Sequence, residues 1–194
     1  MAKKSIDLKI NTDPQWAAYI VENFDEFLAD HANCERKASA LAMSLIVKYP
    51  DRTKIIPQLI DLAQEELLHF QQVYAMMEQR NISLTKDTQD PYVKNLLGLL
   101  RHGRDQRFLD RLLISSIIEC RGAERFRLVS QALEDNTLKV FYRDLWATEA
   151  KHGHLFVDLA LQYFTEDEVY PRLEGLADGE ADIIKSLKWR PSLH

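Results

Sequence analysis

Residues 62–73, LAQEELLHFQQV, and residues 141–154, FYRDLWATEAKHGH, each contain the motif Glu-x-x-His. A single Glu lies upstream of each motif at nearly the same distance: the two Glu are 31 positions apart in the first set and 30 positions apart in the second. The six residues are Glu35, Glu66, His69, Glu119, Glu149 and His152. One Glu on each of two helices and Glu-x-x-His on each of two others is the ligand pattern of two-metal carboxylate sites in four-helix bundles.

The chain around these residues has the periodicity of long helices. Apolar residues recur every three or four positions, and each Glu or His of the set falls on such a stripe. The pattern predicts helices over about 14–49, 53–80, 91–100, 105–133, 136–164 and 165–187, with a possible break near 23–30. Asp13, Asn136 or Thr137, and the capping-box sequence that begins at Thr165 are the expected helix starts. The predicted fold class is all-α, a ferritin-like four-helix bundle with additional short and C-terminal helices, as one domain over residues 1–194.

The six residues occupy stripe positions where leucine is expected. A buried carboxylate without a cation loses its hydration at a high cost in free energy, so four inward Glu require compensating charge. Two divalent ions supply it. Glu and His three residues apart share one helix face and can bind one metal together, and mixed carboxylate and imidazole donors suit iron or manganese. We therefore expect two iron ions (Fe2+/Fe3+), with manganese not excluded, at a centre that activates oxygen or peroxide.

Residues next to the set are weaker candidates for a supporting role, because metal-bound His usually donates its second N–H to an oxygen. Glu65 and Thr148 each precede the Glu of a motif, and His31 lies one turn before Glu35. The two cysteines, Cys34 and Cys120, are read as small buried residues.

Composition excludes several classes of protein. The chain has 194 residues, 46% hydrophobic and 28% charged, which is ordinary for a globular domain. Two cysteines are too few for a disulfide framework, the first residues MAKKSIDLKI contain no apolar signal region, and no apolar run is long enough to cross a bilayer. We expect a cytoplasmic protein without a membrane partner.

The six-residue set alone fits ferritins, rubrerythrins, ribonucleotide reductase small subunits and bacterial monooxygenases. The surrounding segments DHANCERKA (30–38), LAQEELLHFQQV (62–73), LLISSIIECRGAERF (112–126) and FYRDLWATEAKHGH (141–154) make the chain resemble the tRNA-(2-methylthio-N6-isopentenyladenosine) hydroxylase family, MiaE. The likeness covers about residues 16–172. It implies a non-haem di-iron monooxygenase that uses O2 and two electrons to hydroxylate the isopentenyl group of a modified adenosine in the tRNA anticodon loop. It also implies an electron-donor protein or reductase, and the six residues as metal ligands through which the chemistry runs.

A tRNA substrate has to be reconciled with a net charge of −5, because phosphate contacts dominate RNA affinity. Charge is unevenly distributed along the chain. Residues 101–127 carry seven Arg against four acidic residues, whereas residues 165–182 carry seven acidic residues and one Arg. The candidate RNA-binding residues are Arg101, Arg104, Arg107, Arg111, Arg121, Arg125 and Arg127.

Two other functions remain open from the sequence. A ferritin- or rubrerythrin-like iron oxidase or peroxidase shares the six residues and needs no RNA substrate, although the chain has no Cys-x-x-Cys of a rubredoxin module. A helical scaffold that binds RNA or protein without catalysis would hold no stoichiometric iron.

Overall fold

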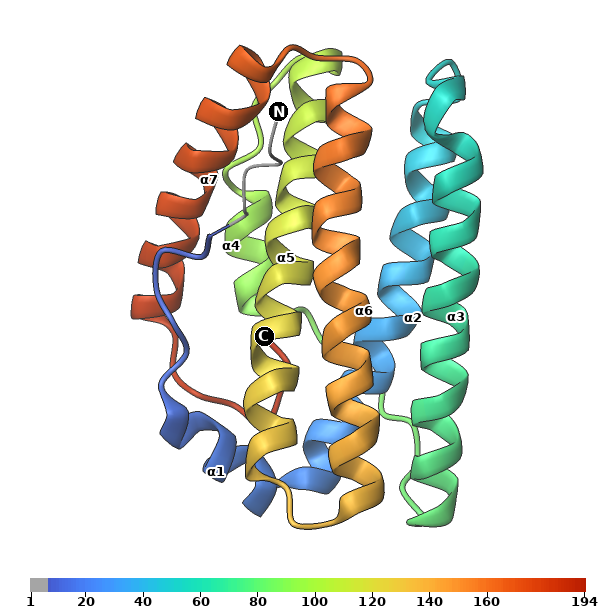
Figure 1. Ribbon diagram of the computed structural model, residues 1–194, viewed down its shortest axis with the longest axis vertical. Helices are drawn as coiled ribbons and strands as arrows, with labels where there is room; N and C mark the ends of the chain where they lie inside the picture. The colour runs from blue at the N-terminus through green and yellow to red at the C-terminus, as the bar shows by residue number, and fades with distance from the viewer. Residues whose placement is uncertain (1–6) are drawn as a thin grey trace. The chain divides into compact units, whose positions relative to one another are not determined.

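The computed structural model describes residues 7–194, which contain seven α-helices and no β-strand (Figure 1). The all-α prediction is confirmed. Residues 1–6, which make up most of the N-terminal stretch that we inspected for a signal, lie outside the described residues. Within residues 7–194, no helix has both the length and the hydropathy needed to cross a membrane.

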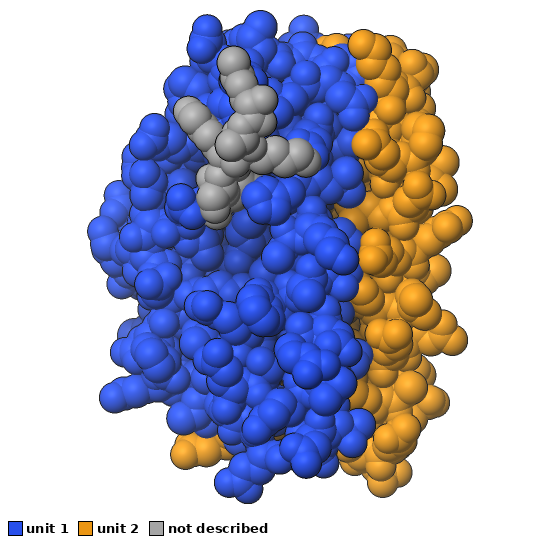
Figure 2. Space-filling view, viewed as in Figure 1, with its two compact units in different colours: residues 1–21, 89–189, 194 blue, residues 22–88, 190–193 orange. Residues whose placement is uncertain are grey.

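The chain divides into two compact units, coloured separately in Figure 2. Unit 1 comprises residues 1–21, 89–189 and 194, and unit 2 comprises residues 22–88 and 190–193. The two Glu-x-x-His motifs fall in different units, and each motif lies in the same unit as its upstream Glu. The single domain expected from the sequence stays a prediction.

Unit 2 is built on two long helices, α2 (Phe24–Lys48) and α3 (Ile56–Gln79), preceded by the short 3-10 helix η1 (Thr53–Ile55). α2 packs along α3, and the Ser39 hydroxyl fixes their register by donating a 2.7 Å hydrogen bond to the Ala63 carbonyl. The apolar stripe of α2 that contains Glu35 is buried, except that Ala38 is only half-buried; its other members are Leu28, Ala32, Ala42 and Leu45.

Unit 1 contains α1 (Pro14–Glu22), α4 (Pro91–Leu97), α5 (Arg104–Ala132), α6 (Asn136–Leu161) and α7 (Glu166–Ser186). α5 and α6 form its main helix pair, and α7 packs against both (Figure 1). The core of this unit includes the fully buried side chains of Tyr92, Phe108, Phe126 and Tyr142. Each pair of long helices is thus stabilised by burial of the apolar stripes on the facing helices, which supplies most of the stability of helices in proteins.

Local sequence signals account for most helix ends. Asp13 caps α1 by accepting from the Gln15 amide, and the capping box at Thr165 is formed. Gly103 precedes α5 with a φ of 95°, a conformation that glycine adopts without steric cost. The expected cap of α6 was wrong: Asp135, not Asn136 or Thr137, accepts from the Leu138 amide. A carboxylate at that position also suits the positive end of the helix dipole.

The long helix expected over residues 14–49 is broken as anticipated, and the break is confined to Asn23, between α1 and α2. The short helix expected to reach residue 100 ends at Leu97, and the fourth bundle helix ends at Leu161 rather than Phe164. These shifts leave all six candidate ligands inside helices.

Candidate metal centre

Unit 2 brings three of the six residues together. Glu35 of α2 and Glu66 and His69 of α3 are all buried, with at most 6% of each residue exposed. His69 Nδ1 lies 3.6 Å from Glu35 Oε2 and 3.5 Å from Glu66 Oε2, and one ligand atom from each residue lies within 4.8 Å of the others. Two carboxylates and an imidazole therefore converge from two helices.

His31 supports this group from α2. It is fully buried, and its Nε2 lies 2.6 Å from Glu35 Oε1. Its ring also stacks on Phe27, with 5.9 Å between the ring centroids. A short contact to a carboxylate, made by a ring that packing holds in place, fixes the orientation of Glu35.

Unit 1 carries the matching group on α5 and α6. Ligand atoms of Glu119, Glu149 and His152 lie within 4.8 Å of one another, and His152 Nδ1 lies 3.0 Å from Glu149 Oε2. Glu149 and His152 are buried, and Glu119 is partly buried. Each unit thus holds one lone Glu beside one Glu-x-x-His pair.

The helices of unit 1 approach closely next to these residues. The Ser116 hydroxyl donates a 2.8 Å hydrogen bond to the Gly153 carbonyl, across α5 and α6. A Cβ at Gly153 would lie 2.5 Å from Cys120 Sγ, a separation that real Cβ atoms essentially never show. In the sequence, the only signal of this close approach is a glycine directly after a candidate ligand.

Neither cysteine is a fully buried residue, contrary to the expectation. Cys34 and Cys120 are both partly exposed. Cys34 Sγ lies 3.7 Å from Asp30 Oδ2. Burial, with the charge of Glu119 adding to it, raises the pKa of Cys120 to about 12. The Cys120 thiol therefore stays protonated at neutral pH and is a poor nucleophile and metal ligand.

The donors of each group fit a divalent metal such as iron or manganese. Oxygen and imidazole donors without thiolate match the preference of these ions. Two carboxylates held close in the protein interior repel each other and lose hydration, which a cation between them offsets. The spacing within each unit is therefore compatible with bound metal.

The other two supporting candidates lie in less enclosed positions. Glu65 is exposed, and the Thr148 hydroxyl donates a 3.3 Å hydrogen bond to the Asp144 carbonyl in the preceding turn of α6. His31, by contrast, is fully buried and contacts Glu35 directly.

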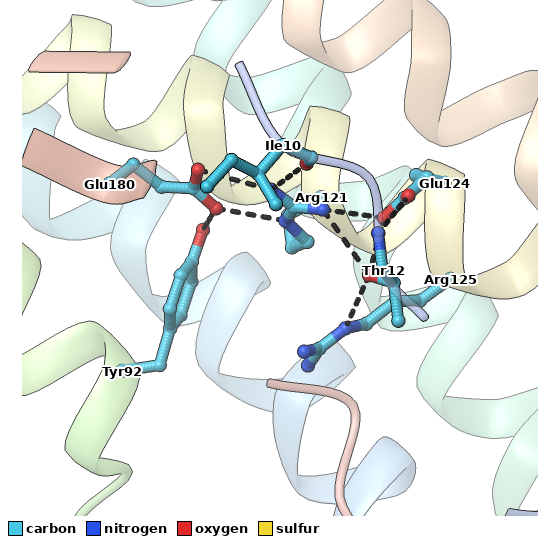
Figure 3. Close-up of polar contacts among 7 residues, drawn as sticks. All are labelled: Ile10, Thr12, Tyr92, Arg121, Glu124, Arg125 and Glu180. Carbon is cyan, nitrogen blue, oxygen red and sulfur yellow. Dashed lines mark hydrogen bonds and ion pairs between the residues drawn. The ribbon is translucent and has the colours of Figure 1, made fainter. Parts of the chain in front are cut away.

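Two of the seven candidate RNA-binding arginines lie in the interior of unit 1 (Figure 3). Arg121 is fully buried and donates to both carboxylate oxygens of Glu180, to Glu124, to the Thr12 hydroxyl and to the Ile10 carbonyl. Burial alone lowers the pKa of Arg121, but the hydrogen bonds and charge of Glu180 outweigh it and the net direction is upward. Arg121 therefore joins the N-terminal segment to α5 and α7 and is not presented to a ligand at the surface.

Arg125 belongs to the same network. Its Nε lies 3.5 Å from Thr12 Oγ1, and its guanidinium lies 4.8 Å from the centroid of the Trp16 ring. Burial lowers its pKa to about 10, which leaves it charged at neutral pH. Tyr92, whose hydroxyl donates to Glu180, completes the cluster, and burial followed by the charge of Glu180 raises its pKa well above the usual value.

The remaining five arginines differ in how much of the side chain is available. Arg101 donates to both oxygens of the buried Asp110, which Arg172 also binds. Burial raises the pKa of Asp110, but the two arginines outweigh it and the net direction is downward. Arg104, Arg107 and Arg127 are exposed, and Arg111 is half-buried.

Three comparisons place the chain among known proteins. A family model described as tRNA-(MS[2]IO[6]A)-hydroxylase (MiaE) matches residues 1–194. A Pseudomonas putida protein named tRNA 2-(methylsulfanyl)-N(6)-isopentenyladenosine(37) hydroxylase is 33% identical over 175 residues, which are 90% of this chain and 85% of the relative. A Salmonella typhimurium protein of the same name is 35% identical over 133 residues, 69% of this chain and 48% of the relative.

A solved structure is similar over nearly the whole chain. It is described as "Protein 43 with aldehyde deformylating oxygenase activity from Synechococcus". The TM-score is 0.91 at 34% identity, covering 96% of this chain and 94% of that one. This match confirms the predicted ferritin-like fold class.

Proposed function

The chain belongs to the MiaE family of tRNA hydroxylases, and from that premise we propose that it hydroxylates the isopentenyl group of 2-methylthio-N6-isopentenyladenosine in tRNA. The family match over residues 1–194 is the observation that carries this proposal. The presence of one buried Glu and Glu-x-x-His group in each unit supports it, because the reaction needs a redox centre and both groups have the donors for one.

We propose further that the two units act as one domain, in which Glu35, Glu66, His69, Glu119, Glu149 and His152 together hold two iron ions. Four carboxylates balance the charge of two divalent ions. The bound irons would supply activation of O2, and manganese is accepted by the same donors. The chain supplies position: His31 orients Glu35, and the close packing of Ser116 against Gly153 fixes the spacing of α5 and α6.

The overall reaction sets what else is required. Insertion of one oxygen atom of O2 into a C–H bond yields an alcohol, and the other atom leaves as water with two protons and two electrons. A side chain that is oxidised as the reductant is used up in one turnover, so repeated turnover needs a renewable source of electrons. The proposal therefore includes an external electron-donor protein or reductase, in the reducing cytoplasm where tRNA is found.

The tRNA anticodon loop is the proposed substrate, and exposed arginines of α5 are proposed to bind its phosphates. Arg104, Arg107 and Arg111 recur at helical spacing on one side of α5, and Arg127 is exposed near its end. Arg101 is bound to Asp110 and contributes less. The buried Arg121 and Arg125 are left out of this set.

The test is mass spectrometry of tRNA nucleosides from cells with the gene, without it, and with the gene restored. Loss of the hydroxylated nucleoside, with accumulation of its precursor one oxygen atom lighter, is the expected result. Restoration with His152→Ala should fail, whereas Glu134→Gln, a change at an exposed carboxylate, should restore the product. An unchanged nucleoside profile in cells that make the hydroxylated form would refute the proposal.

The similarity to a protein with aldehyde deformylating oxygenase activity favours one other candidate activity. The purified iron-loaded protein should therefore be offered a long-chain aldehyde beside the tRNA. Conversion of the aldehyde without conversion of tRNA would assign the chain to that reaction. An iron oxidase or peroxidase, the alternative left open by the six residues, is not favoured by the family match.

A further inference from the structure

An aromatic pair lies on the outside of unit 1, away from the interior rings of its core. Trp189 follows the end of α7 and is 45% exposed, although tryptophan is among the most apolar side chains. Its ring lies against Tyr19 of α1, with 6.3 Å between centroids and an interplanar angle of 39°. Tyr19 is half-buried, whereas Trp189 is exposed to solvent.

The segment around Trp189 is basic. Lys185, Lys188 and Arg190 flank it in the sequence, and no residue from Ile183 to His194 is acidic. Lys188 is exposed. Lys185 meets Asp182 at 3.2 Å, but both side chains are more than half exposed, so the pair is weak and readily exchanged for another anion. In a chain with a net charge of −5, this is a local concentration of cations.

We propose that the Tyr19–Trp189 pair, with Lys185 and Lys188, is a second binding surface for the tRNA substrate, at which single-stranded nucleotides stack on Trp189 and their phosphates contact the lysines. This inference rests on the proposed function for the identity of the RNA. Aromatic rings beside cations are the usual means by which proteins bind single-stranded nucleic acid, because every base presents a π-face.

A second exposed tryptophan, Trp146, is the alternative site at which a base could stack. Trp146 of α6 is 37% exposed, and its nearest cation in sequence, Arg143, is already bound to Asp144 at 2.9 and 3.1 Å. Its surroundings are therefore closer to neutral, and phosphate would have to compete with the carboxylate of Asp144. Trp189 is the more exposed of the two, and three cations, Lys185, Lys188 and Arg190, lie within four positions of it in the sequence.

The experiment measures binding of an anticodon stem-loop RNA by fluorescence anisotropy. Trp189→Ala should raise the Kd by roughly fivefold or more, as expected for loss of one base stack. Trp189→Phe, which keeps a ring, should recover most of the affinity, and Trp146→Ala should leave the Kd unchanged. Thermal unfolding identifies any variant that fails to fold. If Trp189→Ala fails to fold, Trp189→Phe combined with Lys188→Glu is used in its place, and it should raise the Kd relative to Trp189→Phe alone.

Charge gives an independent readout. Lys188→Glu should weaken binding and reduce the slope of log Kd against log salt by about 0.7, the value for one lost phosphate contact on a single strand. Lys86→Glu, a matched reversal at an exposed lysine of unit 2, should change the slope much less. Binding by Trp189→Ala and Lys188→Glu within twofold of the unaltered protein would overturn the proposal, as would equal losses in the control variants.

Turnover separates this inference from the proposed function. Trp189→Ala should raise KM for the RNA with kcat unchanged, because Trp189 contributes to binding and not to the chemistry. If the unaltered protein binds the RNA through Trp189 but never hydroxylates it, the proposed function fails and the binding surface stands. If hydroxylation occurs and Trp189→Ala leaves KM unchanged, the surface fails and the function stands.

Discussion

The two Glu-x-x-His helix pairs have the same spacing of candidate ligands and different neighbours. In unit 2, His31 contacts Glu35 from one turn earlier, at 2.6 Å. The matching residue of unit 1, Ser115, donates its hydroxyl to the Arg111 carbonyl. The residue after the motif is Phe70 in unit 2 and Gly153 in unit 1. The repeated ligands are thus held by different neighbours: an imidazole in unit 2 and close helix packing in unit 1.

The difference indicates that the ligand pattern and its support are separable. The ligands are dictated by what the metal accepts, and are therefore repeated. The supports need only hold those ligands in place, which a hydrogen bond or a close backbone approach can each achieve. The following predictions test whether the two halves are equivalent in binding metal and unequal in how they are held.

The largest effect is expected from the ligands themselves. Glu66→Ala and Glu149→Ala should each remove stoichiometric iron and reduce hydroxylation by more than about 100-fold, because losing a ligand exceeds the loss expected from an outer partner. Iron analysis of the purified variants and single-turnover product formation measure both. The exposed change Glu134→Gln is the control. If one unit tolerates the loss with full iron content, the two halves are not equivalent.

The next largest effect is expected for the buried hydrogen-bond network of Arg121 and Glu180 beside the α5–α6 pair. Arg121→Met leaves Glu180 charged and buried, and should lower the free energy of unfolding by about 3–5 kcal/mol. Urea unfolding measures it. The double variant Arg121→Met with Glu180→Leu should recover part of the loss, because the unpaired buried carboxylate of Glu180 is removed while Glu124 keeps its hydrogen bonds from Thr12. Asp182→Asn, which breaks an exposed pair with Lys185, should cost less than about 1 kcal/mol.

His31 tests the support of unit 2 directly. His31→Ala should weaken metal binding by about 10- to 100-fold, as removal of an outer hydrogen-bond partner does. Ser115→Ala, at the matching position of unit 1, should change it little because that hydroxyl is bound to its own helix. Titration of the apo-protein with Fe2+ under anaerobic conditions measures the metal affinity without turnover. Equal losses in both variants would contradict the distinction between the supports.

Gly153 tests the support of unit 1 and carries the smallest expected effect. Gly153→Ala should destabilise the fold by about 1–3 kcal/mol, because the new Cβ meets Cys120 Sγ. Adding Cys120→Ala should relieve the clash. Gly175→Ala, in α7 with nothing within 4 Å, should instead stabilise by about 0.5–1 kcal/mol. Thermal unfolding compares the three, and a neutral Gly153→Ala would show that the Cys120 side chain or the helices give way to the new Cβ without loss of stability.

The arginines show where sequence patterns stop being informative. Residues 101–127 read as a basic segment, yet Arg121 and Arg125 face the interior while Arg107 and Arg127 face solvent. Charge counts do not record direction, and α5 is covered on more than one side by α6, α7 and the N-terminal segment. A helix covered on several sides loses the single polar face on which amphipathic reasoning depends.

By itself the sequence determined the all-α class, the approximate helix limits and the six candidate ligands, because helix periodicity and ligand spacing are local properties along the chain. The family followed from the resemblance of the segments around those ligands. The tertiary structure decided that His31 meets Glu35, that Arg121 is enclosed by Glu180 and Thr12, and that Gly153 lies against Cys120. Those contacts depend on which helix faces meet. That choice is made by packing among side chains distant in sequence, and no local pattern encodes it.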